Sequence, residues 1–87
     1  MDEKKLIKIV KAVANKNRFL ILKCLHKNKE LFVGDLAEMT DLPFRSVSKD
    51  LGILRRAELV KYRNFNLKNY YFINTAKFPK GILKLFQ

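Results

Sequence analysis

Two helical segments separated by only three residues constrain the fold of this chain most strongly. Asp41-Leu42-Pro43 is expected to form a turn between a short helix over residues 36–40 and a longer helix over residues 43–57. Proline fits the first turn of the longer helix, because the N–H group that it lacks would have no partner there. Asp35 is expected to cap the short helix. So short a connection holds the two helices against each other across a sharp bend.

The longer helix has two different faces. Val47, Leu51 and Leu54 stand at i, i+4 and i+7, so they form one apolar stripe that faces the core. The opposite line, within about 30° on a helical wheel, consists of Arg45, Lys49, Gly52 and Arg56. This line carries no acid, whereas a merely solvated helix usually mixes charge signs. Gly52 either permits close approach of a phosphate backbone or is a neutral substitution in a helix held by its packing.

The remaining segments place two helices before this pair and a β-hairpin after it. Residues 4–14 repeat apolar side chains at helical spacing, and a second helix is expected to start at an N-cap, Asn15 or Asn17. Residues 31–33 form a short β-prone stretch. Residues 59–65 and 70–73 are expected to form the hairpin, with residues 66–69 as its loop. A connector (75–79) and a short helix (80–86) follow. The order predicts one domain over residues 1–87, mainly α with a small β-hairpin wing, a winged helix-turn-helix.

The charge is large and uneven. Nineteen Lys and Arg residues against eight Asp and Glu residues give a net charge of +11. Residues 43–87 hold ten basic and two acidic residues, and no acid follows Glu58. This balance favours a nucleic-acid partner over an anionic membrane or an acidic protein. A lysine-rich composition that serves only solubility is the alternative.

Several other classes of protein find no support. No apolar run approaches the roughly 20 residues of a membrane span, and the start of the chain lacks a signal-peptide pattern. The single cysteine, Cys24, cannot form an internal disulfide and indicates a reducing cytoplasm. Cys24 and His26 are two apart on a helix and do not face each other, so no metal site is expected. No nucleophile, base and partner converge, so we expect neither an enzyme nor a cofactor.

Four stretches in this order resemble the ArsR-type winged-helix transcriptional repressors. Residues 14–22 look like the start of the family's second helix, with Arg18, Ile21 and Leu22 at the matching positions. Residues 30–37 resemble its strand-to-helix segment, residues 42–51 its recognition helix and residues 54–60 the run into its wing. Tyr70-Tyr71 matches the aromatic pair on the returning strand. The resemblance covers residues 5–74.

The resemblance implies a homodimer that binds an inverted repeat in double-stranded DNA. Pairing is expected through the helices at residues 1–14 and 79–87, where the candidate interface residues are Leu6, Ile7, Val10, Ile82, Leu83 and Phe86. The sensor half of the family's function does not carry over. Phe32 and Gly34 stand where many members have metal-binding cysteines, and residues 75–87 contain no His, Asp, Glu or Cys. Glu58 replaces a glycine usual before the wing, which questions only the turn there.

The sequence thus predicts a dimeric, sequence-specific repressor in the cytoplasm. The base-facing candidates, on the first two turns of the recognition helix, are Arg45, Ser46, Ser48 and Lys49. The phosphate-contacting candidates at the helix end and wing are Arg55, Arg56, Lys61, Arg63 and Lys68. Phe44 either touches a thymine methyl group or packs the turn, and Tyr70 and Tyr71 are expected in the wing core. The alternatives are a winged helix that binds DNA or RNA without sequence preference, and a protein–protein adaptor.

Overall fold

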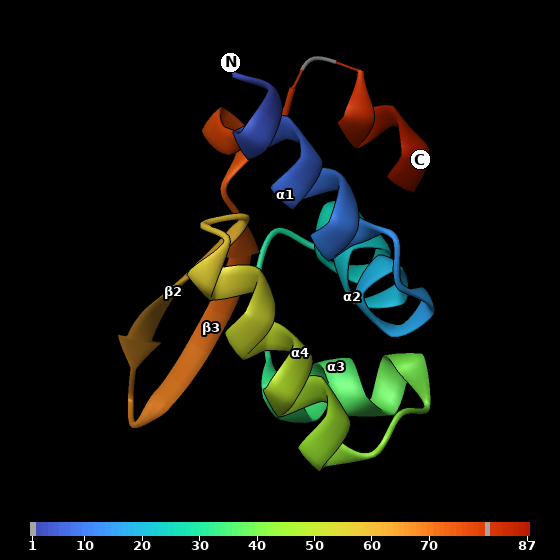
Figure 1. Cartoon of the computed structure of the whole chain (residues 1–87). Helices are drawn as coiled ribbons and strands as arrows, with labels where there is room; N and C mark the ends of the chain where they lie inside the picture. The colour runs from blue at the N-terminus through green and yellow to red at the C-terminus, as the bar shows by residue number, and fades with distance from the viewer. Residues whose placement is uncertain (1, 80) are drawn as a thin grey trace.

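The computed structural model of the chain describes residues 2–79 and 81–87 (Figure 1). Helices α1 (Glu3–Val13) and α2 (Lys16–Lys27) precede a helix-turn-helix pair, α3 (Val33–Thr40) and α4 (Phe44–Arg56). Strands β1 (Leu31–Phe32), β2 (Val60–Phe65) and β3 (Lys68–Ile73) form an antiparallel sheet in the order β1-β3-β2. Two short 3₁₀ helices, η1 (Thr75–Lys77) and η2 (Ile82–Phe86), follow the sheet. The expected winged helix-turn-helix fold is confirmed.

Side chains of the preceding residues cap the first two helices. The Asp2 carboxylate accepts a hydrogen bond from the backbone N–H of Lys5 at 2.8 Å. The Asn15 amide oxygen accepts one from the N–H of Arg18 at 3.1 Å. Asn15, and not Asn17, is therefore the N-cap of α2. This cap fixes a tight corner between α1 and α2, because only two residues separate the helices.

Helix α3 begins three residues earlier than the sequence indicated, and Asp35 does not cap it. Phe32 is the N-cap residue, with an extended backbone and no side-chain capping hydrogen bond. The reason is the sheet, because Phe32 pairs with Tyr70 of β3 and the chain turns into the helix directly after this pair. Asp35 lies in the first turn, where its negative charge still complements the helix dipole.

The turn into α4 is formed as expected, with a shift of one residue. Asp41 takes the left-handed conformation that ends α3, with φ of 58°. Pro43 is the N-cap of α4 and not its first residue. Val47, Leu51 and Leu54 are fully buried, so the apolar stripe is confirmed. The buried residues join all the helices and the sheet in one core, which also contains Ile9, Ala12, Val13, Ile21, Leu22, Leu25, Leu36, Leu59, Val60, Phe78 and Phe86.

The wing hairpin turns through two residues where a four-residue loop was expected. Asn66 and Leu67 both have positive φ values, 53° and 68°, and Phe65 pairs with Lys68 across the turn. Such a turn matches the twist of the strands, so β3 starts at Lys68. At the other end of the wing Glu58 has a φ of 62°. The chain therefore makes a left-handed turn with a glutamate at the position where the ArsR-type resemblance implies a glycine.

The C-terminal segment differs most from expectation. The α-helix expected over residues 80–86 is a 3₁₀ helix that begins at Ile82, and Lys80 lies outside the described residues. The Phe86 ring packs 5.1 Å from that of Phe19 and 6.2 Å from that of Phe78, measured between centroids. This burial of Phe86 ties the segment to α2. Within the described ranges, no helix has both the length and the apolar character needed to cross a membrane.

Candidate nucleic-acid interface

The four base-facing candidates lie near the start of α4, where the buried stripe turns them away from the core. Arg45, Ser48 and Lys49 are exposed, and Ser46 is half-buried beside the start of α2. Phe44 is 61% exposed. Of its two expected roles, packing of the turn therefore does not apply, and the ring is open to contact with a partner. Gly52 and Arg56 continue the line toward the end of the helix. A Cβ atom at Gly52 would lie 3.5 Å from the Arg56 guanidinium, an ordinary contact.

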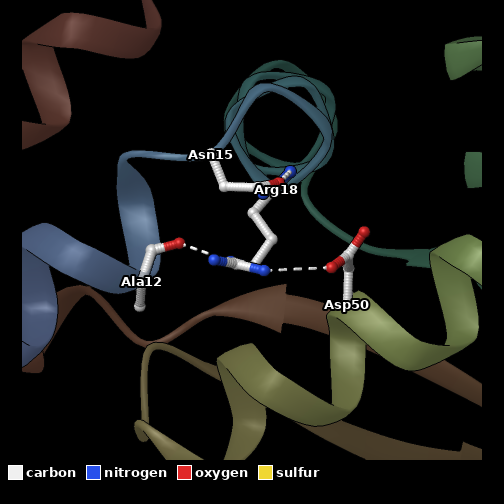
Figure 2. A network of polar contacts seen from close by, with 4 residues as sticks. All are labelled: Ala12, Asn15, Arg18 and Asp50. Atoms are coloured by element: carbon white, nitrogen blue, oxygen red, sulfur yellow. Dashed lines mark hydrogen bonds and ion pairs between the residues drawn. The ribbon is translucent and has the colours of Figure 1, made fainter.

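The acid of α4, Asp50, is buried and paired with Arg18 of α2. Its Oδ1 atom lies 3.1 Å from Nη1 of Arg18, and Nε of Arg18 donates to the carbonyl oxygen of Ala12 at 2.6 Å (Figure 2). One arginine thus connects the end of α1, the start of α2 and the middle of α4. The sequence reading placed Asp50 beside the apolar stripe but missed its partner. The signal was an acid at the edge of a buried stripe, which needs a counter-charge.

At the end of α4, the two arginines face different surroundings. The Arg55 guanidinium lies 5.2 Å from the centre of the Tyr62 ring, which links α4 to β2. Tyr62 in turn pairs with Tyr71 across the hairpin, at 5.4 Å between ring centroids. Burial raises the pKa of the Tyr71 hydroxyl. Arg55 and Arg56 are both exposed, so both can still reach a phosphate.

The basic side chains of the wing share one face of the hairpin. Lys61 and Arg63 pair with Phe72 and Tyr70 of β3, so both point to the face opposite Tyr62. Lys61 is exposed. At the tip of the wing, Lys68 places its ammonium group 4.4 Å from the centre of the Phe32 ring. Beside it Leu67 is 96% exposed.

Arg63 is already engaged by an acid that the sequence reading did not consider. Its guanidinium forms a two-pronged ion pair with Glu30, in which Nε donates to Oε2 at 2.8 Å and Nη2 donates to Oε1. This hydrogen bonding lowers the pKa of Glu30 and raises that of Arg63. The missing signal was the pairing of β1 with β3, which brings Glu30 to the edge of the wing. Arg63 therefore links the wing to the residue before β1. It can contact a phosphate only while it also binds Glu30, or after that ion pair opens.

At the positions where many ArsR-type proteins bind metal, an aromatic ring fills the space. A Cβ atom at Gly34 would lie 2.6 Å from the Phe32 ring, far inside a normal contact. Phe32 and Gly34 offer no donor atoms in their side chains. Cys24 is half-buried, and burial raises the pKa of its thiol. In residues 2–79 and 81–87, no group of three or more His, Cys, Asp or Glu side chains gathers as a metal site.

The dimer-interface candidates divide by exposure. Leu6, Ile7 and Val10 of α1 are 39%, 48% and 49% exposed, a neighbouring set of apolar side chains without cover in one protomer. Ile82 and Leu83 are half-buried. Phe86 is fully buried within its own protomer. Leu85, which was not among the candidates, is 59% exposed and extends the apolar surface of the C-terminal segment.

Comparison with known proteins agrees with this geometry. The family model described as bacterial regulatory protein, arsR family, matches residues 15–62, from the cap of α2 to the middle of β2. The chain belongs to the ArsR family of regulatory proteins. A relative from Methanocaldococcus jannaschii, named as an HTH-type transcriptional regulator, is 33% identical over 81 residues. The match covers 93% of this chain and 90% of that protein.

Two solved structures of regulatory and DNA-binding proteins have the same fold. The transcriptional repressor PagR of Bacillus anthracis superimposes with a TM-score of 0.82 at 29% identity, covering 97% of this chain and 94% of PagR. A homodimeric winged helix-turn-helix DNA-binding domain from Mycobacterium bovis gives a TM-score of 0.78 at 28% identity, covering 95% of this chain and 72% of that one. This ArsR-family chain is therefore a DNA-binding transcriptional regulator of the winged-helix type.

Proposed function

We propose that the protein is a homodimeric repressor that recognises an inverted-repeat operator through α4 and the wing. The observation that carries the proposal is the exposed face of α4, which presents Arg45, Lys49 and Arg56 without an exposed acid. Asp50, the acid of this helix, faces inward and is paired with Arg18 at 3.1 Å. The exposed side chains of α4 thus include positive charges and no negative charge, which favours binding to a phosphate backbone.

In this proposal the start of α4 reads the bases. The candidates Arg45, Ser46, Ser48 and Lys49 occupy the first two turns, which enter the major groove in helix-turn-helix proteins. Arginine and lysine can donate to guanine, and serine can bond to a base or to phosphate. The exposed Phe44 ring is placed to contact a thymine methyl group.

The remaining cations position the protein on the phosphate backbone. Arg55, Arg56, Lys61 and Lys68 surround the end of α4 and the wing, where phosphate contacts fix orientation but carry no sequence information. Arg63 also forms an ion pair with Glu30, so it links β2 of the wing to the residue before β1. A wing in a fixed position would keep its phosphate contacts in register with the contacts that α4 makes.

The dimer is proposed to form through α1 and the C-terminal segment. Leu6, Ile7 and Val10 leave an apolar surface on α1, and Leu85 adds to it from η2. Two copies that pair through such a surface place two α4 helices in successive major grooves on one side of the duplex. The homodimeric state named for the Mycobacterium bovis structure supports this assembly. The repressor role named for PagR supports the proposed repression.

One experiment tests both the sequence-specific recognition of DNA and the dimer. Purified protein selects bound sequences from a random duplex library, and the enriched pool is sequenced. We expect an inverted repeat with half-site centres about one helical turn, roughly 10 base pairs, apart. Binding without an enriched motif would instead assign the protein to non-specific DNA binding. A single half-site without its repeat would contradict the dimer. Repression is tested by placing the selected repeat over a reporter promoter.

A further inference from the structure

Three adjoining hollows follow the seam between α4 and the corner where α1 meets α2. The first, of about 200 Å³, lies between the start of α2 and residues Ser46 to Ile53 of α4. The second, of about 430 Å³, shares Arg18 and Ile53 with it. The third, of about 170 Å³, shares Lys8 and Arg56 with the second and reaches Lys77. Because each hollow shares walls with the next, together they form one groove, here called the α1–α4 seam.

The position of the seam follows from the packing of α1. Ile9, Ala12 and Val13 of α1 are buried in the core, and the C-terminal end of α4 points toward the part of the molecule that holds α1 (Figure 1). At 100° per residue, Lys8 lies opposite Leu6 and Val10, and Lys11 lies between Lys8 and Ile7. One helix therefore presents an apolar surface in one direction and lysines in another.

The seam is strongly cationic because its own acids are neutralised. Asp50 is held by Arg18 at 3.1 Å, and Glu58 is held by Lys77 at 3.2 Å. The other charged residues that line the seam are Lys5, Lys8, Lys11, Lys49 and Arg56. All five are exposed, and among the residues that the structure describes none of them forms an ion pair. The seam thus keeps five uncompensated positive charges.

We propose that the α1–α4 seam is a track for the phosphodiester backbone of DNA, so that α1 extends the DNA contact beyond the recognition helix and the wing. This proposal rests on the proposed function and adds Lys5, Lys8 and Lys11 to the DNA-contacting residues. Lys49 lines the hollow beside the base-facing start of α4, and the other four cations line the two hollows beside α1. The positive charges are therefore spread over three hollows and do not gather in one, so the complementary ligand is a linear polyanion. From Ser46 to Arg56 the helix rises about 15 Å, a length that can accompany a short run of phosphates of one strand.

The test compares two double variants of equal charge. Lys8→Gln with Lys11→Gln removes two of the seam lysines on α1. Lys23→Gln with Lys27→Gln is the matched control, because both are exposed on α2 and line none of the three hollows. Binding to one operator-bearing duplex of about 40 base pairs, long enough for contacts beyond the half-sites, is measured by fluorescence anisotropy across a salt series. Sedimentation and thermal melting check the assembly and fold of each variant.

We expect the seam variant to lose about two units of salt slope per bound protomer, and roughly tenfold or more in affinity near 0.1 M salt. The control should keep the wild-type slope, and Lys8→Arg with Lys11→Arg should retain the slope of the wild type. A seam variant that binds with the wild-type slope overturns the track. The track is also overturned if weaker binding is seen only together with a lower melting temperature or a changed state of assembly. Wild-type protein without salt-dependent binding would instead sink the proposed function itself.

Discussion

Nη1 of Arg18 lies 3.1 Å from Oδ1 of Asp50, so a residue at the start of α2 holds the acid of the recognition helix. The same guanidinium reaches the last turn of α1 through the carbonyl oxygen of Ala12. The two side chains are 16% and 10% exposed, so little water competes with the contact. The orientation of α4 is therefore coupled to the corner between α1 and α2.

Asp50→Ala should lower the free energy of unfolding by about 2 to 3 kcal/mol, because it leaves the largely buried Arg18 guanidinium without a counter-charge. Asp50→Asn keeps an oxygen that can accept the hydrogen bond and should cost only about 1 kcal/mol. Urea denaturation measures both values. Equal losses for the two variants would contradict the expected difference, because they would show that the interaction depends on the charge of Asp50 and that an amide oxygen cannot replace it.

Gly52→Ala separates stability from DNA binding. The new methyl group would meet only the flexible end of Arg56, at 3.5 Å. The substitution should therefore raise the free energy of unfolding by about 1 kcal/mol, the helix-propensity difference between the two residues. If a phosphate backbone comes close to Gly52, affinity for the operator should fall although stability rises. Unchanged affinity would show that this glycine has no contact role.

Glu30→Gln tests the ion pair that ties the wing to β1. Arg63 holds the pKa of Glu30 below its ordinary value of 4.5 in the folded protein. The carboxylate therefore adds stability at pH values above 4.5, and this contribution is lost as the pH falls through the lower folded-state pKa. Urea midpoints measured between neutral and acidic pH should fall more steeply for the wild type than for the variant. If the urea midpoints of the two proteins fell in parallel with pH, the ion pair between Glu30 and Arg63 would not contribute to stability.

Arg45→Ala and Arg55→Ala should differ in what they lose. Removal of Arg45 should cost about 1 to 3 kcal/mol on the selected operator and much less on random DNA, because this side chain is assigned to bases. Removal of Arg55 should weaken both complexes alike and reduce the salt slope by about one unit. Anisotropy titrations on the two duplexes measure this. An equal loss on both duplexes for Arg45→Ala would reassign it to the backbone.

Periodicity predicted the parts of the fold that depend on neighbours along one helix. Val47, Leu51 and Leu54 were assigned to the core from spacing alone, and all three are fully buried. The Asn15 cap, the three-residue turn and the hairpin also came from local signals. The ArsR-type resemblance correctly indicated the family, which the match over residues 15–62 confirms.

The features that the sequence did not predict depend on contacts between distant residues. Helix α3 begins at Val33 because β1 pairs with β3, and the partner of Phe32 in this pairing is Tyr70, 38 residues further along the chain. A two-residue turn at Asn66 and Leu67 was missed because leucine rarely adopts a positive φ. The partners of Asp50 and Arg63 were missed for the same reason, since their sequence separations are 32 and 33 residues.

The ring of Phe32 over Gly34 also limits how this chain could change in evolution. Gly34→Cys alone would drive a Cβ atom to 2.6 Å from that ring, so the intermediate would be strained before it could gain a ligand. Phe32→Cys as the first step avoids this contact, and it removes the ring on which Lys68 rests at the wing tip. The less strained order of substitutions toward a metal-responsive descendant thus begins with a protein that has an altered wing.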